Sequence, residues 1–425
     1  MNKTCTSAAF SSGSEPLPTR LVLLTSSFPY GVGEPFLEAE LAYLSARFDS
    51  VVLVPYKSNG GQMRRELPPN VSVFAPLRPE RWFVLRMISQ GLFNRISWFP
   101  FLRELCRERF FGGRPGLLVQ WLSLSLLVRM LASRSHVRAL YFGKGYRQVV
   151  YSYWGTMPAS IYGALGAVCP YVVRLHGVDI YAEREDNRGY IFGRPDLLSR
   201  VHFVAHVSEH GMAYLRKRYP LISYQARVCR LGVHSPGLSP IQDDGVLKIL
   251  TCSRIIPLKR LELLSQALSL VSFPVHWVHI GDGPGKESLE HSVRSLGMPV
   301  RVQLLDAMSN AEVLNYYVQH PVDVFVNVSS TEGVPVTVME ALSCGVPVLA
   351  TSVGGTPELV DSLVGGLLPP DLTPAFLADA LCAFWSLDSS QRMRLRHAAY
   401  ERWKDRADAA RNYAEMAEAL QGLLG

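Results

Sequence analysis

Residues 322–358 read VDVFVNVSSTEGVPVTVMEALSCGVPVLATSVGGTPE, and this stretch decides the fold. Its apolar, β-branched start predicts a buried strand over 322–329. A turn follows, and then a helix over 335–343, which a Gly-Val-Pro tripeptide ends. Residues 347–351 predict the next strand. A strand, a helix and a second strand in this order are typical of a parallel sheet covered by helices.

The same alternation fills most of the chain, and it is interrupted once. Residues 234–245 hold two prolines, two glycines and two aspartates, without periodicity. Apolar strands separated by helices on both sides of this break predict an α/β fold with two Rossmann-like, doubly wound lobes and a ligand cleft between them. Strands are expected over 20–27, 50–56, 71–76, 149–154, 171–176 and 202–208 in the first lobe, and over 246–253, 276–281, 300–305, 322–329 and 347–351 in the second.

These patterns predict how the chain divides. The expected parts are a disordered tail over 1–19, a first lobe over 20–238 with a basic and aromatic helical insertion over 78–147, a linker over 239–246, a second lobe over 247–404 and a C-terminal helix over 405–425.

The cysteines and the hydrophobic segments predict a compartment. Seven scattered cysteines, an odd number with no CxxC pair, favour reduced thiols and argue against a disulfide framework or a zinc cluster. Residues 1–19 lack the apolar core of a signal peptide. The charge-free stretch 115–128 is shorter than the roughly 20 residues that span a bilayer. We expect a cytoplasmic protein without a transmembrane helix.

Residues 78–147 carry most of the positive charge. The chain has a net charge of +7, yet this segment alone holds 12 arginines and one lysine against three acids, together with many aromatic residues. Such a segment suits the anionic inner face of a plasma membrane. It equally suits a helical insertion whose aromatics form core and whose arginines are solvated. Nucleic acid is not expected, because no nucleic-acid-binding motif accompanies the charge.

Two glutamates in the quoted stretch are candidate ligand-binding residues. Glu332 lies at the turn after the strand, and Glu340 follows eight residues later, about two turns along the helix. Carboxylates accept hydrogen bonds from paired sugar hydroxyls. The backbone N–H groups at the helix start, around Gly333, Val334 and Val336, can bind phosphate or sugar oxygens.

A second candidate segment follows the first strand of the second lobe. It reads TCSRIIPLKR over 251–260 and contains Arg254 and Lys259. A diphosphate leaving group gains negative charge as its bond to a sugar breaks. An arginine fork and a lysine point charge beside it would lower that barrier.

Together these segments resemble the donor site of the retaining family-4 glycosyltransferases, which are similar to glycogen synthase and are also called group 1 glycosyltransferases. The resemblance covers about residues 21–424 and implies the GT-B fold. It is dense in the second lobe and thin in the first, which implies that the second lobe holds the nucleotide-sugar donor and the first lobe the acceptor. It implies that Glu332 binds hydroxyls of the transferred sugar and Glu340 the nucleotide ribose. It also implies that Arg254 and Lys259 hold the diphosphate, with no metal ion and no other cofactor. The GDGP turn that contains Gly281 is similar to a turn near the nucleotide, although a plain tight turn explains it equally well.

Two segments of the first lobe resemble the same family. In RLHGVD over 174–179, the resemblance implies that His176 contacts the donor sugar, so that His176 and Glu332 form the catalytic pair. Asp179 is expected to cap the next turn, and Arg174 is either structural or a ligand of an acceptor phosphate. The loop with Gly31 and Gly33 is expected to face the donor phosphates.

The predicted activity is transfer of a hexose-type sugar from a nucleoside-diphosphate sugar to a glycan or lipid-linked acceptor, in cell-surface polysaccharide biosynthesis. A sugar-nucleotide epimerase or a phosphorylase would use the same scaffold, and fold alone does not decide among them. A nicotinamide oxidoreductase is disfavoured because the first loop is not GxGxxG. A non-catalytic membrane-surface binding protein is disfavoured because the four charged site residues are all present.

Overall fold

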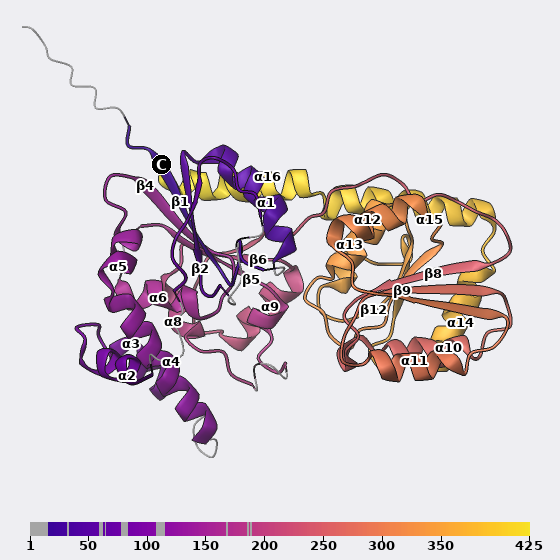
Figure 1. Ribbon diagram of the computed structural model, residues 1–425, viewed down its shortest axis with the longest axis horizontal. Coiled ribbons are helices and arrows are strands. Elements are labelled where there is room, and N and C mark those ends of the chain that lie inside the picture. Colours follow the sequence, from indigo (N-terminus) through magenta and orange to yellow (C-terminus); the bar gives the residue numbers. More distant parts are fainter. Residues whose placement is uncertain are drawn as a thin grey trace, which may run out of the picture.

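The computed structural model describes residues 16–425 except 32–33, 59–62, 64, 78–83, 108–114, 167–168, 185–186 and 188. Two lobes lie side by side, and each is a parallel sheet with helices on both faces (Figure 1). This arrangement confirms the predicted α/β fold with two doubly wound lobes.

The first lobe is built on a seven-stranded sheet within the described residues, in the order β3-β2-β1-β4-β5-β6-β7. Every pairing in it is parallel. Its central strands are fully buried because helices cover both faces, which explains their near-continuous apolar sequences. The strands are β1 (Thr19–Thr25), β2 (Ser50–Pro55), β3 (Val71–Val73), β4 (Arg147–Ser152), β5 (Tyr171–Leu175), β6 (Phe203–His206) and β7 (Ala226–Val228). The helices are α1 (Pro35–Arg47), α2 (Val84–Phe93), α3 (Phe99–Arg107), α4 (Pro115–Ser133), α5 (Ser135–Phe142), α6 (Met157–Leu165), α7 (Gly177–Ile180), α8 (Arg194–Arg200) and α9 (Glu209–Arg218).

The second lobe repeats this topology with one strand fewer, in the order β10-β9-β8-β11-β12-β13. All of its pairings are parallel as well. Its strands are β8 (Leu247–Cys252), β9 (Val275–Ile280), β10 (Val300–Leu305), β11 (Val324–Asn327), β12 (Val348–Thr351) and β13 (Gly365–Leu368). Its α-helices are α10 (Leu261–Leu268), α11 (Lys286–Arg294), α12 (Asn310–Gln319), α13 (Val336–Ser343), α14 (Pro374–Trp385) and α15 (Ser389–Arg406).

Two edge strands were not predicted from the sequence. β7 has only three residues, with one arginine among them, and β13 begins with two glycines. Neither carries the apolar, β-branched run that marks a buried strand, because an edge strand is paired on one side only. The expected strand over 71–76 is also shorter, since β3 ends at Val73.

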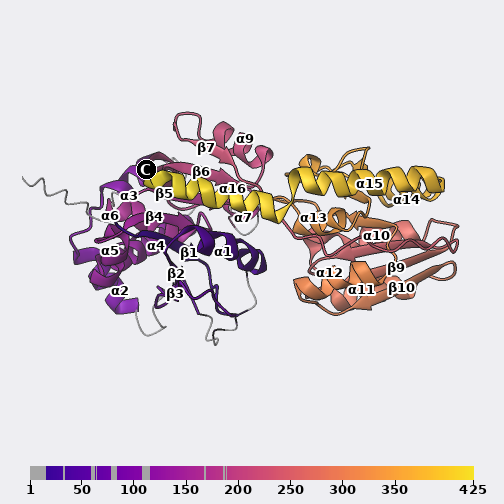
Figure 2. The ribbon, with the colours of Figure 1, turned by 90° about the horizontal axis from the view of Figure 1, so that it is seen from above.

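The C-terminal helix returns to the first lobe. The sequence predicts one helix over 405–425, whereas the structure ends α15 at Arg406 and begins α16 (Ala409–Gln421) after a break. The Asp408 side chain causes the new start, because it accepts a hydrogen bond from the N–H of Ala410. Helix α16 packs on α1, and Figure 2 shows it lying along the first lobe. The guanidinium of Arg147 donates to the carbonyl of Leu424 and fastens this end.

The insertion between β3 and β4 forms helices α2 to α5 at the end of the first lobe that is distant from the second (Figure 1). Contrary to the prediction, α4 is long and apolar enough to cross a membrane by length and composition, over Gly116–Ser133. Half of that segment is buried inside the first lobe. In this structure α4 therefore serves partly as a core helix.

Candidate active site

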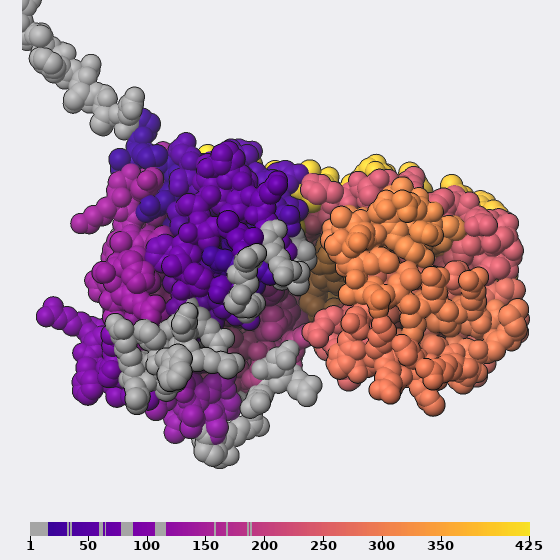
Figure 3. All heavy atoms as spheres, viewed as in Figure 1, coloured from indigo at the N-terminus to yellow at the C-terminus, as the bar shows by residue number. Residues whose placement is uncertain are grey.

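The candidate site lies between the lobes, where loops that follow β1, β4 and β5 face loops that follow β8, β11 and β12. Figure 3 shows the molecular surface hollowed between the two lobes. The lobes touch through Gly177, which begins α7, and Gly333, which precedes α13. A Cβ on Gly177 would lie 3.0 Å from Cα of Gly333, so glycine permits this backbone contact.

Glu358 ties the lobes together beside this contact. It lies in the short turn after β12, and its carboxylate accepts from the N–H of His210 at 3.0 Å. The same carboxylate pairs with the guanidinium of Arg230 at 3.0 Å. Both partners belong to the first lobe, so this residue fixes the spacing of the two walls of the site.

Lys259 and Glu332 meet across two loops of the second lobe. The Lys259 Nζ donates to Oε1 of Glu332 at 2.6 Å, and Nδ2 of Asn327 donates to the same oxygen at 3.3 Å. Lys259 ends a short turn after β8, whereas Glu332 lies in the turn after β11. The two side chains are 21% and 12% exposed, so a ligand in the cleft can reach them. Because β8 and β11 flank the point where the strand order reverses, this pair occupies the usual ligand position of an open parallel sheet.

The other cations of this loop are placed differently. Arg254 is exposed at the end of the sheet where Lys259 also lies. Arg260 instead donates to the carbonyls of Val328 and Ser329 at 2.6 and 3.2 Å. Of the two adjacent bases, Lys259 faces Glu332 and Arg260 holds the end of β11.

Glu340 is buried on helix α13, which follows the turn that holds Glu332. It lies on α13 and is 5% exposed, and its Oε1 accepts from Nδ2 of Asn310 at 2.5 Å. Burial raises the pKa of Glu340 to about 8, and the hydrogen bond from Asn310 opposes that rise. The carboxyl is therefore mostly protonated at pH 7. Glu340 therefore does not face solvent.

The start of α13 presents backbone donors beside Glu332. The helix begins at Val336, so its first N–H groups have no acceptor within the helix. Gly333 and Val334 form the half-buried approach to it. Gly355 donates its N–H to the Gly333 carbonyl at 2.6 Å, which fixes the turn. The resulting edge of N–H groups suits phosphate or sugar oxygens.

Gly281 has a packing role that needs no ligand. It has a φ of 151°, and a Cβ there would lie 1.9 Å from the carbonyl oxygen of Ser253. Only glycine permits this approach of the two loops that follow β8 and β9. The neighbouring loops, rather than a nucleotide, account for glycine at this position.

His176 forms part of the first-lobe wall. It is 7% exposed and precedes α7, and Trp154 packs on its ring with the centroids 4.3 Å apart. Its Nδ1 lies 3.6 Å from Oδ2 of Asp179, beyond hydrogen-bonding distance, and its Nε2 has no hydrogen-bond partner within the described residues. Burial lowers the pKa of His176, so the ring is neutral at pH 7. Asp179 accepts from the His176 N–H at 3.2 Å, which confirms its predicted capping role.

Glu34 holds the loop that follows β1, a role that the sequence analysis missed. Its carboxylate accepts from the N–H groups of Ser26, Ser27 and Phe28 at 3.0, 2.8 and 2.8 Å. It also accepts from Nε1 of Trp154 at 2.6 Å. The residue is 6% exposed and has a φ of 59°, which non-glycine residues seldom adopt. The signal available in the sequence was an acid in a glycine loop on the ligand side of the sheet.

The remaining predicted residues of the first lobe divide into two groups. Gly31 has a φ of 71° in the loop that Glu34 holds, and Gly33 lies outside the described residues. Arg174 is completely buried and forms an ion pair with the equally buried Glu40 of α1. Of the two roles considered for Arg174, the structural one fits, because a buried pair cannot meet an acceptor phosphate.

Asn310 and Asn327 are further site residues that the sequence analysis missed. Asn327 ends an otherwise apolar buried strand, and a polar residue in such a strand was an available signal. Asn310 starts α12, where nothing in its neighbourhood predicts contact with Glu340. No group of three or more His, Cys, Asp or Glu side chains that could hold a metal ion occurs among the residues that the structure describes.

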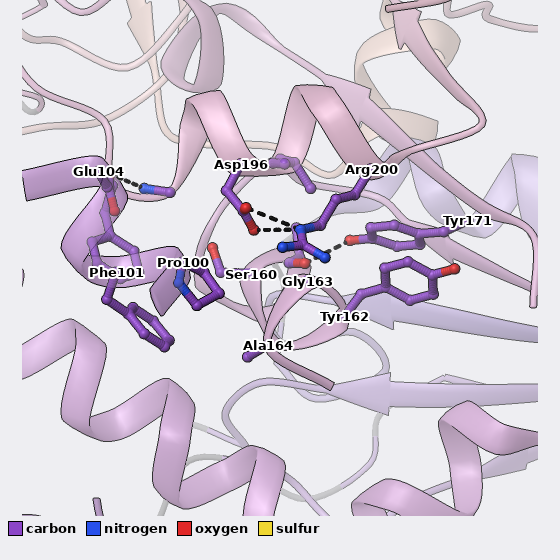
Figure 4. A pocket seen from close by; sticks show the side chains of 14 residues that line it. Pro100, Phe101, Glu104, Ser160, Tyr162, Gly163, Ala164, Tyr171, Asp196 and Arg200 are labelled. Carbon is purple, nitrogen blue, oxygen red and sulfur yellow. Dashed lines mark hydrogen bonds and ion pairs between the residues drawn. The ribbon is translucent and has the colours of Figure 1, made fainter. Parts of the chain in front are cut away.

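Another pocket lies away from the candidate site, between α3, α6 and α8 (Figure 4). One wall carries the ion pair of Asp196 and Arg200, whose atoms are 2.9 Å apart. Another carries Glu104, which accepts from the N–H of Gly193 at 2.6 Å. Because these polar groups satisfy one another, the pocket is explained by the packing of the insertion on the lobe.

Comparison with known proteins agrees with this geometry. Residues 240–402, nearly the whole second lobe, match the family model described as glycosyl transferases group 1. A D-inositol 3-phosphate glycosyltransferase of Mycolicibacterium gilvum is 32% identical over 163 residues, 37% of this chain and 36% of that protein. A putative colanic acid biosynthesis glycosyltransferase of Escherichia coli K12 is 27% identical over 260 residues, 58% of this chain and 63% of that protein. The matches thus span less than two thirds of these relatives.

Solved structures extend the likeness to both lobes. Sucrose-phosphate synthase from Thermosynechococcus elongatus superposes with a TM-score of 0.67 at 18% identity, covering 95% of this chain and 99% of that one. HepE of Anabaena in complex with UDP-glucose superposes with a TM-score of 0.61 at 18% identity, over 95% and 99%. At such identities the likeness concerns the fold, and the fold is GT-B, as the sequence resemblance implied.

Proposed function

We propose that this chain, whose second lobe matches the group 1 glycosyltransferases, is a retaining glycosyltransferase. It would move a hexose-type sugar from a nucleoside-diphosphate sugar to a glycan or lipid-linked acceptor. The observation that carries the proposal is the Lys259–Glu332 pair at the switch point of the second sheet, 2.6 Å apart and open to the cleft. The Lys259 ammonium can bind a diphosphate, and the adjacent Glu332 carboxylate can accept hydrogen bonds from the hydroxyls of the sugar that the diphosphate carries.

In the proposed complex the donor would separate the ion pair. The diphosphate would take the ammonium of Lys259, assisted by Arg254 and by the N–H groups at the start of α13. Glu332 would then be free to accept from sugar hydroxyls. Glu340, which lies further along α13, would accept hydrogen bonds from the ribose hydroxyls of the nucleotide. No metal ion enters this scheme, because these groups neutralise the diphosphate.

Transfer with retention would place the acceptor on the same face as the leaving group. The bond from the anomeric carbon to the phosphate oxygen breaks, and the acceptor oxygen forms the new bond to that carbon. The proton of the acceptor hydroxyl passes to the departing phosphate oxygen. His176, which is neutral and whose Nε2 has no hydrogen-bond partner among the described residues, would hydrogen-bond the transferred sugar from the first lobe.

The relatives support the substrate class of this proposal. One relative is a D-inositol 3-phosphate glycosyltransferase and another is a putative colanic acid biosynthesis glycosyltransferase. One protein of similar fold has been solved in complex with UDP-glucose. We therefore place the chain in cell-surface polysaccharide or glycolipid synthesis. We also propose that it works in the cytoplasm at the inner face of the plasma membrane, where lipid-linked acceptors are available and reduced cysteines persist.

A thermal-shift screen tests the donor site. The full chain is melted with UDP, GDP, ADP, CMP and NAD⁺, alone and as Arg254→Ala. We expect one nucleoside diphosphate to raise the melting temperature, and we expect the shift to fall strongly in Arg254→Ala. Arg301→Ala, an exposed arginine on β10, is the matched control and should keep the shift. Stabilisation by NAD⁺ alone, or by no nucleoside diphosphate, would contradict the proposal.

A further inference from the structure

The insertion is fixed firmly to the first lobe. Arg129 of α4 is buried, and its guanidinium donates to the carbonyls of Gly91 at 2.7 Å and of Ile96. The Cζ atom of this guanidinium lies over the Trp98 ring, 4.0 Å from the ring centroid. Gly91 lets α2 and α4 approach closely, since a Cβ there would lie 2.6 Å from the carbonyl oxygen of Leu126. This arginine is therefore a structural anchor of the turn between α2 and α3.

Helix α3 is anchored as well. Its Glu104 accepts from the hydroxyl of Tyr190 at 2.7 Å and from the N–H of Gly193 at 2.6 Å (Figure 4). Phe101 packs on Phe192 with centroids 6.4 Å apart. The exposed side chains of α2, α3 and α4 thus stand on a rigid base.

The outer faces of these helices are apolar although they meet solvent. Phe93 is 86% exposed, Phe99 68% and Val119 65%. The inward aromatic residues, by contrast, are buried, as Trp121 and Phe101 show. We call the outer set the apolar ledge; its members are Ile88, Leu92, Phe93, Phe99, Leu102, Leu118, Val119 and Leu122. These residues lie on α2, α3 and α4, of which α2 and α4 pack directly on each other, and exposed apolar side chains gathered on neighbouring helices mark an interaction surface.

The charge around the ledge is positive. Arg95 lies between α2 and α3, Arg103 lies on α3, and both are exposed. Among the described residues of the insertion, the acid is Glu104, which is 4% exposed and committed to the contacts given above. Cationic and apolar side chains on one surface match a lipid headgroup layer, in which phosphates meet the arginines and the acyl boundary receives the rings.

We propose that the apolar ledge docks this chain on an anionic membrane surface, with Phe93, Phe99 and Val119 entering the interface and Arg95 and Arg103 binding lipid phosphates. The occupant is a lipid surface rather than a second copy of the chain. A symmetric dimer through this patch would bring its arginines together, and the described part of the patch has no exposed acid to compensate them. The docking itself is independent of the proposed function, and only its use, access to a lipid-linked acceptor, rests on that function.

Vesicle flotation of the full chain tests the docking. Wild-type protein is mixed with vesicles of phosphatidylcholine alone and of phosphatidylcholine with phosphatidylglycerol. We expect binding to the anionic vesicles at low salt, and a marked loss of binding as salt is raised. Phe93→Ser with Phe99→Ser, and separately Arg95→Glu with Arg103→Glu, should each weaken it at least about tenfold. Phe376→Ser and Arg301→Glu, exposed residues of the second lobe, are the matched controls and should bind as wild type.

The outcomes separate this inference from the proposed function. Equal flotation of the Phe93→Ser, Phe99→Ser protein and the wild type would overturn the ledge. So would an absence of wild-type flotation at low salt, or a concentration-dependent dimer in light scattering that the same double substitution abolishes. Nucleotide thermal shifts measured on the same proteins report on the donor site alone. Retained flotation without any nucleotide shift would therefore sink the function and leave the docking standing.

Discussion

The two lobes share one strand order but use the corresponding loops in opposite ways. In each sheet the order reverses beside the first strand, between β1 and β4 in one lobe and between β8 and β11 in the other. At both reversals a side chain of the first loop contacts a residue of the second. In the first lobe the contact is Glu34 to Trp154, and in the second it is Lys259 to Glu332, each at 2.6 Å.

The difference lies in how fully each bridge is satisfied. Glu34 receives four N–H donors in a buried setting, so a ligand that displaced it would leave those donors unpaired. Lys259 and Glu332 are partly exposed. In the proposed complex, a phosphate would replace Glu332 as the partner of Lys259, and a sugar hydroxyl would replace Lys259 as the partner of Glu332. One position of the fold is thus a fixed wall in the first lobe and, in the proposed donor site, an exchangeable bridge in the second.

The largest expected effect comes from breaking the exchangeable bridge. Lys259→Ala and Glu332→Ala should each reduce transfer by about 10²–10³-fold, because each removes a group aimed at charge or hydroxyls in the transition state. Initial rates with the nucleotide sugar identified by thermal shift provide the measurement. Lys286→Ala is the control, since Lys286 pairs with the exposed Asp306 in the same lobe. Turnover near the wild-type value in either site variant would show that this bridge is only structural.

Breaking the fixed bridge should affect stability before donor binding. Glu34→Ala leaves three backbone N–H groups and one indole N–H without their acceptor, at a cost of about 2–4 kcal/mol in the free energy of unfolding. Urea denaturation measures this loss. Glu38 lies on α1, the helix that begins directly after Glu34, and its side chain is exposed, so Glu38→Ala should change stability by less than about 0.5 kcal/mol. A nucleotide shift that survives in Glu34→Ala would sharpen the contrast, and unchanged stability would refute it.

Sequence patterns predicted the second lobe better than the first because its site is largely local. Glu332 and Glu340 sit on one strand–turn–helix unit that the sequence pattern predicted, whereas their roles in donor binding stay predictions. The partner of Glu340 is Asn310, thirty residues away on another helix, and only the order of strands brings the two together. Glu34 was missed for the same reason, since its indole donor Trp154 lies 120 residues along the chain.

The insertion shows a second limit of sequence reasoning. Its composition left a membrane surface and a solvated helical insertion equally open, and the structure divides the residues between a core and a surface. Arg129 and Trp121 point inward, whereas Arg95 and Phe93 point outward. One arginine and one aromatic residue point each way, so residue type cannot distinguish them. Only packing, which depends on contacts between helices, separates the inward from the outward side chains. The aromatics at 82, 83, 110 and 111 lie outside the described residues.

The smallest expected effect concerns the pH dependence of nucleotide binding. The pKa of Glu340 is raised from 4.5 to about 8 by burial, so the neutral carboxyl stabilises the folded state fully below pH 4.5. That contribution is lost as pH rises through 8. Ribose hydroxyls would favour the ionised carboxylate, so binding would lower its pKa and release a proton.

Affinity for the nucleoside diphosphate should therefore rise about fivefold between pH 7 and 8.5 in the wild type. Glu340→Gln cannot ionise, so its affinity should be weaker and flat over the same range, while its stability relative to the wild type should increase with pH. Calorimetry in two buffers of different ionisation enthalpy would detect the released proton directly. An equal rise in affinity in Glu340→Gln would assign the titration to another group and remove Glu340 from the exchangeable site.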